Sequence, residues 1–442
     1  MKLTWINLHD LIEYELRQRQ EEGLGVDAFR ERWYDMKERE ASSMEREARQ
    51  LLDELSAWPA PIQLQKQEPS ELREICLERP VGAKLPGREI SQEQLADRIL
   101  GGWLGRAAGC LLGKPVERTP RPGIKELLQS NDTWPLLDYI TAAGIPAELL
   151  TKYPWNKHSG RESLKENIQC MTEDDDLNYP MLNLHVLETC GMNFTTEHIA
   201  ETWLSRLPAL SIFTAERVAY LNLLRGMSPP ATAAFRNPYR EWIGAQIRAD
   251  VWGWVSPGAP ERAANLAWRD ARLSHVRSGI YGEMFFAAMI AGACVCDDLS
   301  LILSQGLSQI PRQSRFADAI RFAVDLLNVE KDWEAAVDRL YEKFGHYHWV
   351  HTINNAALVA AAVLCGDGDF ERSICSVVMG GWDTDSNGAT VGSILGTMLG
   401  AKKLPSKWIA PLNNRVRSSM KGFDNSAIDE LAMRTLKQAV KL

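Results

Sequence analysis

The chain has 442 residues, of which 45% are hydrophobic and 24% charged, the usual balance of a soluble globular protein. On a soft prior of roughly 150 residues per domain, this length allows two or three domains, or one large core with an attached segment. The formal net charge of -8 argues against a protein built to coat nucleic acid, which usually carries a basic patch or stripe. The longest apolar run, residues 280–296, contains Glu283 and Gly292, so a buried helix explains it better than a membrane span.

The first residues of the chain contain no continuous apolar stretch behind a basic end, the pattern by which a secretory signal is recognised. We therefore expect a cytoplasmic protein. The eight cysteines include no C-x-x-C pair, so the sequence favours reduced thiols over a disulfide framework or a zinc site.

The sequence predicts two parts: a helical N-terminal extension with a linker at residues 1–90, and a main domain at residues 91–442. Within residues 1–55, apolar side chains recur at helical spacing and are followed by a charged run. We interpret this part as a solvated helical hairpin packed on the main domain, rather than as a catalytic element. Residues 58–88 hold five prolines among polar residues, which is typical of a linker.

The main domain begins with a helix that opens at Ser91 and Gln94, which have the spacing of a capping box. Within this helix glycine recurs every four residues, at positions 101, 105, 109 and 113, and the same spacing returns at positions 388, 392, 396 and 400. Each glycine costs about 0.5–1 kcal/mol relative to alanine inside a helix, so close approach of another backbone or of a ligand must offset the cost. We predict that the two helices pack tightly at the functional centre, with Gly113 as a candidate substrate-binding residue.

Helical patterns also occupy much of the remaining chain, whereas strand-like alternation is nearly absent. The predicted helices are residues 181–188, 196–207, 211–225, 261–271, 279–296, 300–309, 315–327, 333–341 and 355–364. This pattern predicts an all-α fold, a compact bundle of many helices.

An unbroken acidic row, EDDD, occupies residues 173–176. Carboxylates this close either raise each other's pKa or need a cation to neutralise them, and carboxylate oxygens suit a hard divalent ion. The segment DTDS, residues 383–386, offers further oxygen ligands directly before the second glycine-lined helix. Each segment alone is ambiguous, since acidic and hydroxyl side chains also serve as helix caps. We expect the fold to bring the two together around metal.

With these motifs the chain resembles the ADP-ribosylglycohydrolase family, which includes the dinitrogenase reductase-activating glycohydrolases. The resemblance covers about residues 95–402. It rests on GGWLGRAAGCLLGKPVE at 101–117, TEDDD at 172–176, SGIYGEMFFAAMIAGA at 278–293 and GGWDTDSNGATVGSILGTMLGA at 380–401. It implies an all-α fold with two magnesium or manganese ions, and hydrolysis of the glycosidic bond between ADP-ribose and an acceptor.

The resemblance also implies a set of site residues. The family's T-D-D-T motif falls on residues 172–175 or on residues 173–176, and the second register is preferred because it keeps both central aspartates. The D-T-D-[ST] motif falls on residues 383–386. The implied metal ligands are Thr172, Glu173, Asp174, Asp175, Asp383, Asp385 and Ser386, with Asp176 as a further ligand in the second register. Glu117 matches the family's acid that contacts the anomeric region of the substrate, so Glu117, Asp174 and Asp175 are the expected catalytic residues.

Two positions depart from the family's pattern. Cys110 stands where many members have aspartate, and Trp382 stands where glycine usually precedes D-T-D. A large aromatic side chain beside the metal site can stack on a base or block part of the usual ligand, so Trp382 is a candidate substrate-binding residue. The histidine-rich stretch at residues 345–356 lacks metalloprotease spacing and suits loop or capping roles better than zinc. Within it, His351 and Asn354 are further candidates for the substrate pocket.

The leading hypothesis is a divalent-metal-dependent hydrolase that removes ADP-ribose, or a related ribosyl group, from a small molecule or an ADP-ribosylated partner. Cys110 and Trp382 keep open a hydrolase of another N- or O-riboside. A binding or structural protein of the same fold is disfavoured, because an abandoned site has no reason to keep closely spaced carboxylates that repel each other without metal. We expect neither nucleic acid nor a membrane as a partner.

Overall fold

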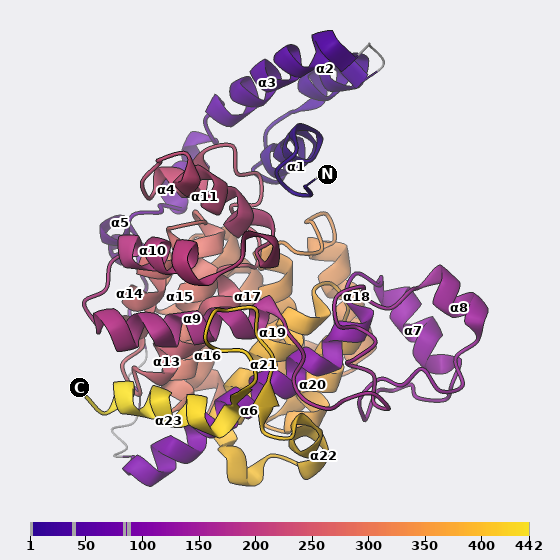
Figure 1. Cartoon of the computed structure of the whole chain (residues 1–442), viewed down its shortest axis with the longest axis vertical. Helices are drawn as coiled ribbons and strands as arrows, with labels where there is room; N and C mark the ends of the chain where they lie inside the picture. Colours follow the sequence, from indigo (N-terminus) through magenta and orange to yellow (C-terminus); the bar gives the residue numbers. More distant parts are fainter. Residues whose placement is uncertain (1–2, 38–40, 83–84, 86–89, 442) are drawn as a thin grey trace.

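The computed structural model describes residues 3–37, 41–82, 85 and 90–441, without the side chains of residues 41–44. In this part of the chain the regular structure is helical (Figure 1), apart from the short antiparallel pair β1 (Arg415–Val416) and β2 (Ser426–Ala427). The all-α prediction is confirmed. None of the helices in the described residues combines the length and the apolarity that a membrane crossing requires.

The helices follow one another along the chain, and their bounds set the frame for the site. The N-terminal part contains α1 (Leu8–Glu21), α2 (Asp27–Lys37), α3 (Ala41–Ala57), α4 (Ile62–Gln67) and α5 (Leu72–Glu78). It is followed by α6 (Gln92–Gly113), α7 (Arg121–Gln129), α8 (Ala147–Lys152), α9 (Asp175–Cys190), α10 (Thr196–Arg206), α11 (Thr214–Leu224), α12 (Ala231–Ala234), α13 (Asp250–Trp254) and α14 (Pro260–Ala271). The second half contains α15 (Ser278–Ala293), α16 (Leu299–Leu307), α17 (Arg315–Val329), α18 (Trp333–Phe344), α19 (Thr352–Gly366), α20 (Phe370–Met379), α21 (Thr384–Leu399), α22 (Ser406–Ile409) and α23 (Ile428–Ala439). Short 3₁₀ helices lie at Lys114–Val116, Ala209–Ser211, Gln246–Arg248, Ala401–Lys403 and Ala410–Leu412.

The two glycine-lined helices, α6 and α21, lie side by side in backbone contact, as predicted. We call this contact the glycine seam; it joins Gly101, Gly105 and Gly109 of α6 to Gly396, Gly392 and Gly388 of α21, so the helices run antiparallel. A Cβ atom added at Gly109 would lie 1.9 Å from the carbonyl oxygen of Gly388. Only glycine permits this approach, which is why the helices tolerate the conformational cost of so many glycines.

Gly109→Ala is expected to lower the free energy of unfolding by about 1–3 kcal/mol or more, because the added methyl group must push two backbones apart. Chemical denaturation measures the loss. Gly292→Ala is the matched control: Gly292 lies in the buried helix α15, but the nearest atom to an added Cβ there is Gln305 Cγ, at an ordinary contact distance of 3.5 Å. The control should leave stability unchanged or raise it by up to about 1 kcal/mol. Equal losses in the two variants would contradict the backbone contact.

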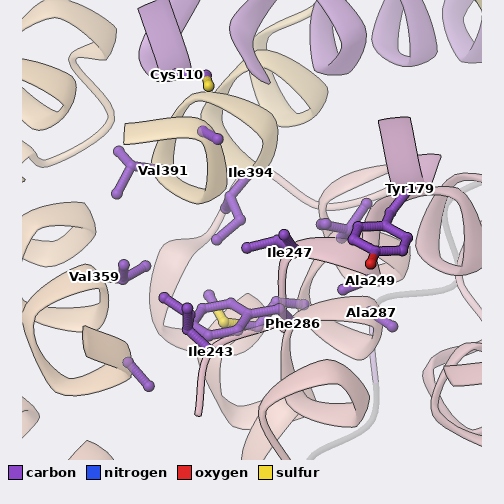
Figure 2. Packing of buried hydrophobic residues seen from close by; sticks show 14 of the residues in the cluster. Cys110, Tyr179, Ile243, Ile247, Ala249, Phe286, Ala287, Val359, Val391 and Ile394 are labelled. Atoms are coloured by element: carbon purple, nitrogen blue, oxygen red, sulfur yellow. The ribbon is translucent and has the colours of Figure 1, made fainter. Parts of the chain in front are cut away.

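The apolar core surrounds the seam. All residues of α15 are buried, and most of α19 is buried with it. Figure 2 shows Ile394 of α21, Phe286 of α15 and Ile247 of the segment before α13 converging in this core. Because the core lies beside the seam, it supports the helix ends at which the acidic motifs stand.

Residues 8–57 contain three helices, α1 to α3, where the sequence predicted a hairpin within residues 1–55. These helices share a small apolar core of their own, which includes Ile12, Leu16, Trp33, Leu51 and Leu55. Between α1 and α2 the chain turns at Gly23, whose φ of +87° suits glycine. The helical character was therefore predicted correctly, but the charged run concealed an additional turn.

The predicted linker at residues 58–88 is, in its described part, a packed segment that contains α4 and α5. Pro61 caps α4 at its start, where a missing amide hydrogen costs nothing. The Arg315 guanidinium pairs with the Glu68 carboxylate at 2.8 Å, which fastens the segment to the main body. Proline was thus a signal of helix boundaries here, rather than of irregular chain.

Sequence reasoning missed several helices, of which α23, α20 and α7 are the longest. In α23 the buried residues Ile428, Leu431 and Thr435 recur at helical spacing, so a signal was present. Helix α23 packs against α6, and Figure 1 shows it at the opposite end of the molecule from α1 to α3.

Candidate active site

Three helix ends meet at the centre of the site: the C-terminal end of α6 and the N-terminal ends of α9 and α21. Asp174 is the N-cap of α9, and its Oδ1 accepts a hydrogen bond from the Asp176 amide at 2.9 Å. Thr384 Oγ1 donates to the Gly113 carbonyl at 2.8 Å, which joins the start of α21 to the end of α6. The Ser386 hydroxyl donates to Asp176 Oδ2 at 3.0 Å, across 210 residues of sequence. The fold therefore brings the two acidic segments together, as predicted.

Lys114 directly follows the last glycine of α6 and places its ammonium group among three carboxylates. Its Nζ lies 2.5 Å from Asp174 Oδ2, 2.8 Å from Asp385 Oδ2 and 2.9 Å from Glu117 Oε2. Burial acts to lower the pKa of Lys114, but Asp174 and Asp385 raise it well above its ordinary value. The amine therefore stays charged and neutralises part of the charge that the acidic segments assemble.

Arg106 is a second buried cation at the same centre. Its guanidinium group pairs with Asp176 at 2.9 Å and with Asp250 at 2.8 Å, and it donates to the Ile247 carbonyl at 2.6 Å. Because Asp176 also accepts the hydrogen bond from Ser386, it connects α9 to both glycine-lined helices. Asp176 thus helps to position the helices through direct contacts with Arg106 and Ser386, unlike Asp174 and Asp175.

The carboxylates at the centre outnumber the cations that face them. Six carboxylates, from Glu117, Asp174, Asp175, Asp176, Asp383 and Asp385, line the same cavity as Lys114 and the more exposed Arg118, with the Arg106 guanidinium behind them. Burial and the neighbouring carboxylates raise the pKa values of Asp175 and Asp383 well above the ordinary value. For Asp385, burial acts in the same direction, yet Lys114 holds the pKa below its usual value. The excess of acidic groups calls for further positive charge.

This set of donors fits a hard divalent cation. Glu117, Asp383 and Asp385 each offer a carboxylate oxygen, and these atoms lie within 4.8 Å of one another. Oδ1 of Asp385 is buried and has no hydrogen-bond donor among the described residues, an arrangement that is costly without a counter-charge. Oxygen ligands are those that magnesium and manganese prefer. Cys110 also lies beside acidic residues, but burial raises its pKa, so its thiol stays protonated and suits such an ion poorly.

A cavity of about 610 Å³ opens onto the acidic centre, and many of its lining residues belong to one of two sets. The acidic set contains Glu117, Glu173, Asp174, Asp175, Asp176, Asp383 and Asp385, together with Lys114 and Ser386. The aromatic set contains Trp5, Tyr14, Phe213 and Trp349. Ile243 and Ile247, which Figure 2 shows within the core, form an apolar part of the wall. The cavity can therefore hold a ligand with one polar and one apolar portion.

Glu117 is fixed by two donors at the edge of the acidic centre. Its Oε2 accepts hydrogen bonds from Lys114 Nζ at 2.9 Å and from Asn156 Nδ2 at 2.6 Å. Burial and the nearby Asp385 raise the pKa of Glu117 to about 7. A carboxyl group with such a pKa can both accept and release a proton near neutral pH.

Most of the predicted site residues line the cavity: Glu117, Glu173, Asp174, Asp175, Asp383, Asp385 and Ser386. Thr172 does not, because its hydroxyl lies 3.3 Å from the Ser163 hydroxyl on the buried side of the segment. Residues 173–176 all line the cavity, and the register of the motif stays a prediction. Asp385 and Ser386 lie in the first turn of α21, and Asp383 is its N-cap, so two of the three predicted ligands at this motif belong to the helix itself.

The four predicted substrate-binding residues do not line this cavity. Gly113 packs on the α21 backbone, where an added Cβ would lie 2.2 Å from the Thr384 carbonyl oxygen. Trp382 is buried and stacks on Tyr341, with the ring centroids 4.3 Å apart. The structure thus assigns both residues to packing.

His351 and Asn354 instead organise the start of α19. Nδ1 of His351 accepts a hydrogen bond from the Ile353 amide as a helix cap, and Asn354 donates to the His348 carbonyl at 3.3 Å. Burial lowers the pKa of His351 to about 3, so its ring is neutral in the folded protein. The capping role that the sequence favoured for this stretch is the role that His351 has.

Sequence reasoning missed Lys114, Arg106 and Asn156. Two of them carried a signal: Arg106 is a charge inside an otherwise apolar helix, and Lys114 stands three residues before Glu117. Asn156 lies in an irregular segment with no motif, so only the structure identifies it as a hydrogen-bond donor to Glu117.

The chain is similar to known proteins. Residues 91–441 match the model of the ADP-ribosylglycohydrolase family. The chain is 25% identical over 325 residues to an uncharacterized protein of Archaeoglobus fulgidus, and the alignment covers 71% of this chain and 90% of that protein. A solved structure described as an ADP-ribosylglycohydrolase-related protein complex is 20% identical with a TM-score of 0.49, covering 79% of this chain and 99% of the other. Since the family match spans most of the chain and includes both acidic motifs, the chain belongs to the ADP-ribosylglycohydrolase family, and this membership supports a glycohydrolase activity.

Proposed function

We propose that the protein is a divalent-cation-dependent hydrolase that cleaves the glycosidic bond of ADP-ribose, or of a related ribosyl group, attached to an acceptor. The observation that carries the proposal is the convergence of six carboxylates on one side of a cavity, in excess of the buried cations that face them. Membership of a glycohydrolase family supports the reaction type.

Asp174, Asp175, Asp383, Asp385 and Ser386 are the residues that would hold magnesium or manganese. When bound, such an ion supplies Lewis-acid charge that offsets the carboxylates and polarises oxygen atoms of the sugar. The ammonium group of Lys114 lies within hydrogen-bond distance of both Asp174 and Asp385. It holds the pKa of Asp385 below its usual value and opposes the burial that raises the pKa of Asp174. The site is therefore organised around positive charge before substrate arrives.

Glu117 is the residue that moves the proton. Lys114 and Asn156 hold its carboxylate in one orientation, and it lines the cavity, so it can take the proton of the water that attacks the anomeric carbon. The same carboxyl group can return that proton to a leaving group that requires one. Ile243 and Ile247 form an apolar wall that limits access of further water.

The second candidate is a hydrolase of a different N- or O-riboside. Part of the cavity lining, including Trp5 and Tyr14, precedes the residues that match the family. Because these lining residues lie outside the family match, they favour a substrate whose non-ribosyl portion differs from that of the substrates of other family members. The acidic set would serve the same bond cleavage in either case.

The experiment is an assay of ADP-ribose release from ADP-ribosylated arginine and serine, alongside simple N- and O-ribosides, with chelator-treated and cation-restored protein. The proposal expects release only after magnesium or manganese is restored. Cleavage of simple ribosides alone would move the assignment to the second candidate. Binding of ADP-ribose without turnover of any substrate would overturn both candidates in favour of a non-catalytic binding protein.

A further inference from the structure

The N-terminal segment precedes the residues that match the family, and yet it lines the cavity. Its contribution, the N-terminal wall, consists of Thr4, Trp5, Asp10 and Tyr14. We propose that this wall is part of the substrate-binding site and recognises a planar heteroaromatic ring that bears an N–H donor. The inference rests on the proposed function, because the ring is carried by the same ribosyl substrate that the acidic set holds.

Buried ion pairs fix the helix that carries the wall. Within α1 and the residue after it, the carboxylates of Glu15 and Glu22 each lie 2.7 Å from the Arg240 guanidinium, and Arg277 also pairs with Glu22. All these charges are largely removed from water. Loss of one partner would leave an uncompensated buried charge, which is strongly unfavourable. Helix α1 is therefore packed on the main domain, as predicted, but the face that carries Glu15 and Glu22 is buried and not solvated.

The residues before α1 are positioned through their backbone. Arg217 donates to the Thr4 carbonyl at 3.2 Å, and the Tyr239 hydroxyl donates to the Trp5 carbonyl at 3.1 Å. Trp5 has a φ of +69°, which is uncommon for a bulky residue and persists only where surrounding contacts maintain it. The contacts that hold Trp5 at the cavity therefore outweigh the conformational cost of its backbone geometry.

The rings of the wall have the properties of a stacking surface. Tyr14 packs against Trp242 and His348, with ring centroids 5.3 Å and 5.6 Å apart, so its ring cannot turn away. It nevertheless remains partly exposed and lines the cavity, as do Phe213 and Trp349 of the main body. Rigid, partly exposed rings around one cavity are suited to stacking on a planar ring.

Asp10 gives the wall its polar selectivity. Oδ2 of its carboxylate accepts hydrogen bonds from the Trp5 amide at 2.8 Å and from Asn7 Nδ2 at 2.6 Å, which fixes the group. Its Oδ1 has a more distant ionisable neighbour, His9 Nδ1 at 3.8 Å, and the side chain is 23% exposed. A fixed anionic acceptor beside aromatic rings favours a ring with an amino or ring N–H group.

The test is calorimetric binding to the full chain in the presence of magnesium, with adenosine as the ring-bearing probe and ribose 5-phosphate as the ringless probe. Tyr14→Leu is expected to weaken adenosine binding at least about fivefold, the effect of losing one stacking contact, and to leave ribose 5-phosphate binding unchanged. Tyr34→Leu is the matched control, since Tyr34 lies on α2 outside the cavity and is 49% exposed. It should change neither affinity.

Asp10→Asn provides a second variant if Tyr14→Leu fails to fold, because asparagine keeps an oxygen that can accept from the Trp5 amide. Wild-type protein should prefer adenosine to purine riboside, which lacks the amino group, and the variant should lose that preference. Equal changes for adenosine and ribose 5-phosphate, or no preference for adenosine in the wild type, would overturn the inference. Failure of the proposed function would appear separately, as absence of hydrolysis while the ring-dependent difference in binding persists.

Discussion

Asp385→Asn is expected to abolish calorimetric binding of magnesium and manganese and to lower hydrolysis at least about 100-fold, because loss of even an outer partner of a metal ligand costs roughly 10–100-fold. Asp385 keeps one buried carboxylate oxygen open to a cation. Its Oδ2 pairs with Lys114 at 2.8 Å, while its buried Oδ1 has no donor among the described residues. An amide at this position removes the charge with almost no change of shape.

The matched control is Asp318→Asn, which makes the same chemical change at a side chain that is 67% exposed and pairs with Arg321. It should bind the cations and turn over substrate like the wild type. Retention of stoichiometric cation binding by Asp385→Asn, in protein that unfolds at the same temperature as the wild type, would show that Asp385 is not a ligand.

Lys114→Met is expected to lower the free energy of unfolding of the cation-free protein by about 3–5 kcal/mol, the cost of leaving buried carboxylates without their partner. Removal of this ammonium group leaves Glu117, Asp174 and Asp385 facing one another. Millimolar magnesium should recover much of the loss, since a divalent cation can supply the missing charge. Thermal unfolding with and without magnesium measures both effects.

Lys125→Met is the control, because Lys125 pairs with Glu334 at a position that is 41% exposed. Exposed pairs contribute about 0–1 kcal/mol, so this variant should unfold near the wild-type temperature. If magnesium raised the unfolding temperature of Lys114→Met no more than that of the wild type, Lys114 and the cation would not share these carboxylates.

The centre of the molecule could be predicted because its signals are local. A period of four residues in glycine indicates which helix face another backbone approaches, and adjacent carboxylates indicate a need for counter-charge. The contact between Gly109 and Gly388 and the meeting of the two acidic segments followed those signals, whereas Lys114, which pairs with Asp174 and Asp385, was missed. Neither conclusion needed the order of the remaining helices.

The N-terminal wall could not be predicted, because its contacts join residues that are distant in sequence. Glu15 and Glu22 have the spacing of one helix face, but such a pattern is the same for a solvated helix and for one paired with buried arginines. Tyr14 meets Trp242 and His348 from separate segments of the main body. For the same reason Trp382, which the motif places beside the metal ligands, stacks on Tyr341 instead of lining the cavity.

The glycine seam restricts α6 and α21 to a few separate registers relative to each other, and the site at their ends takes its geometry from the register. Neighbouring glycines along α6 or α21 are four residues apart, which corresponds to a rise of about 6 Å, so the next register in which glycine meets glycine lies a full step away. Sliding by a fraction of that step would press side chains into a backbone. Mutations in the outer core therefore cannot gradually widen the distance between Glu117 and Asp383. Changes in substrate range have to arise in the parts of the cavity whose position the seam does not determine. The N-terminal wall is one such part.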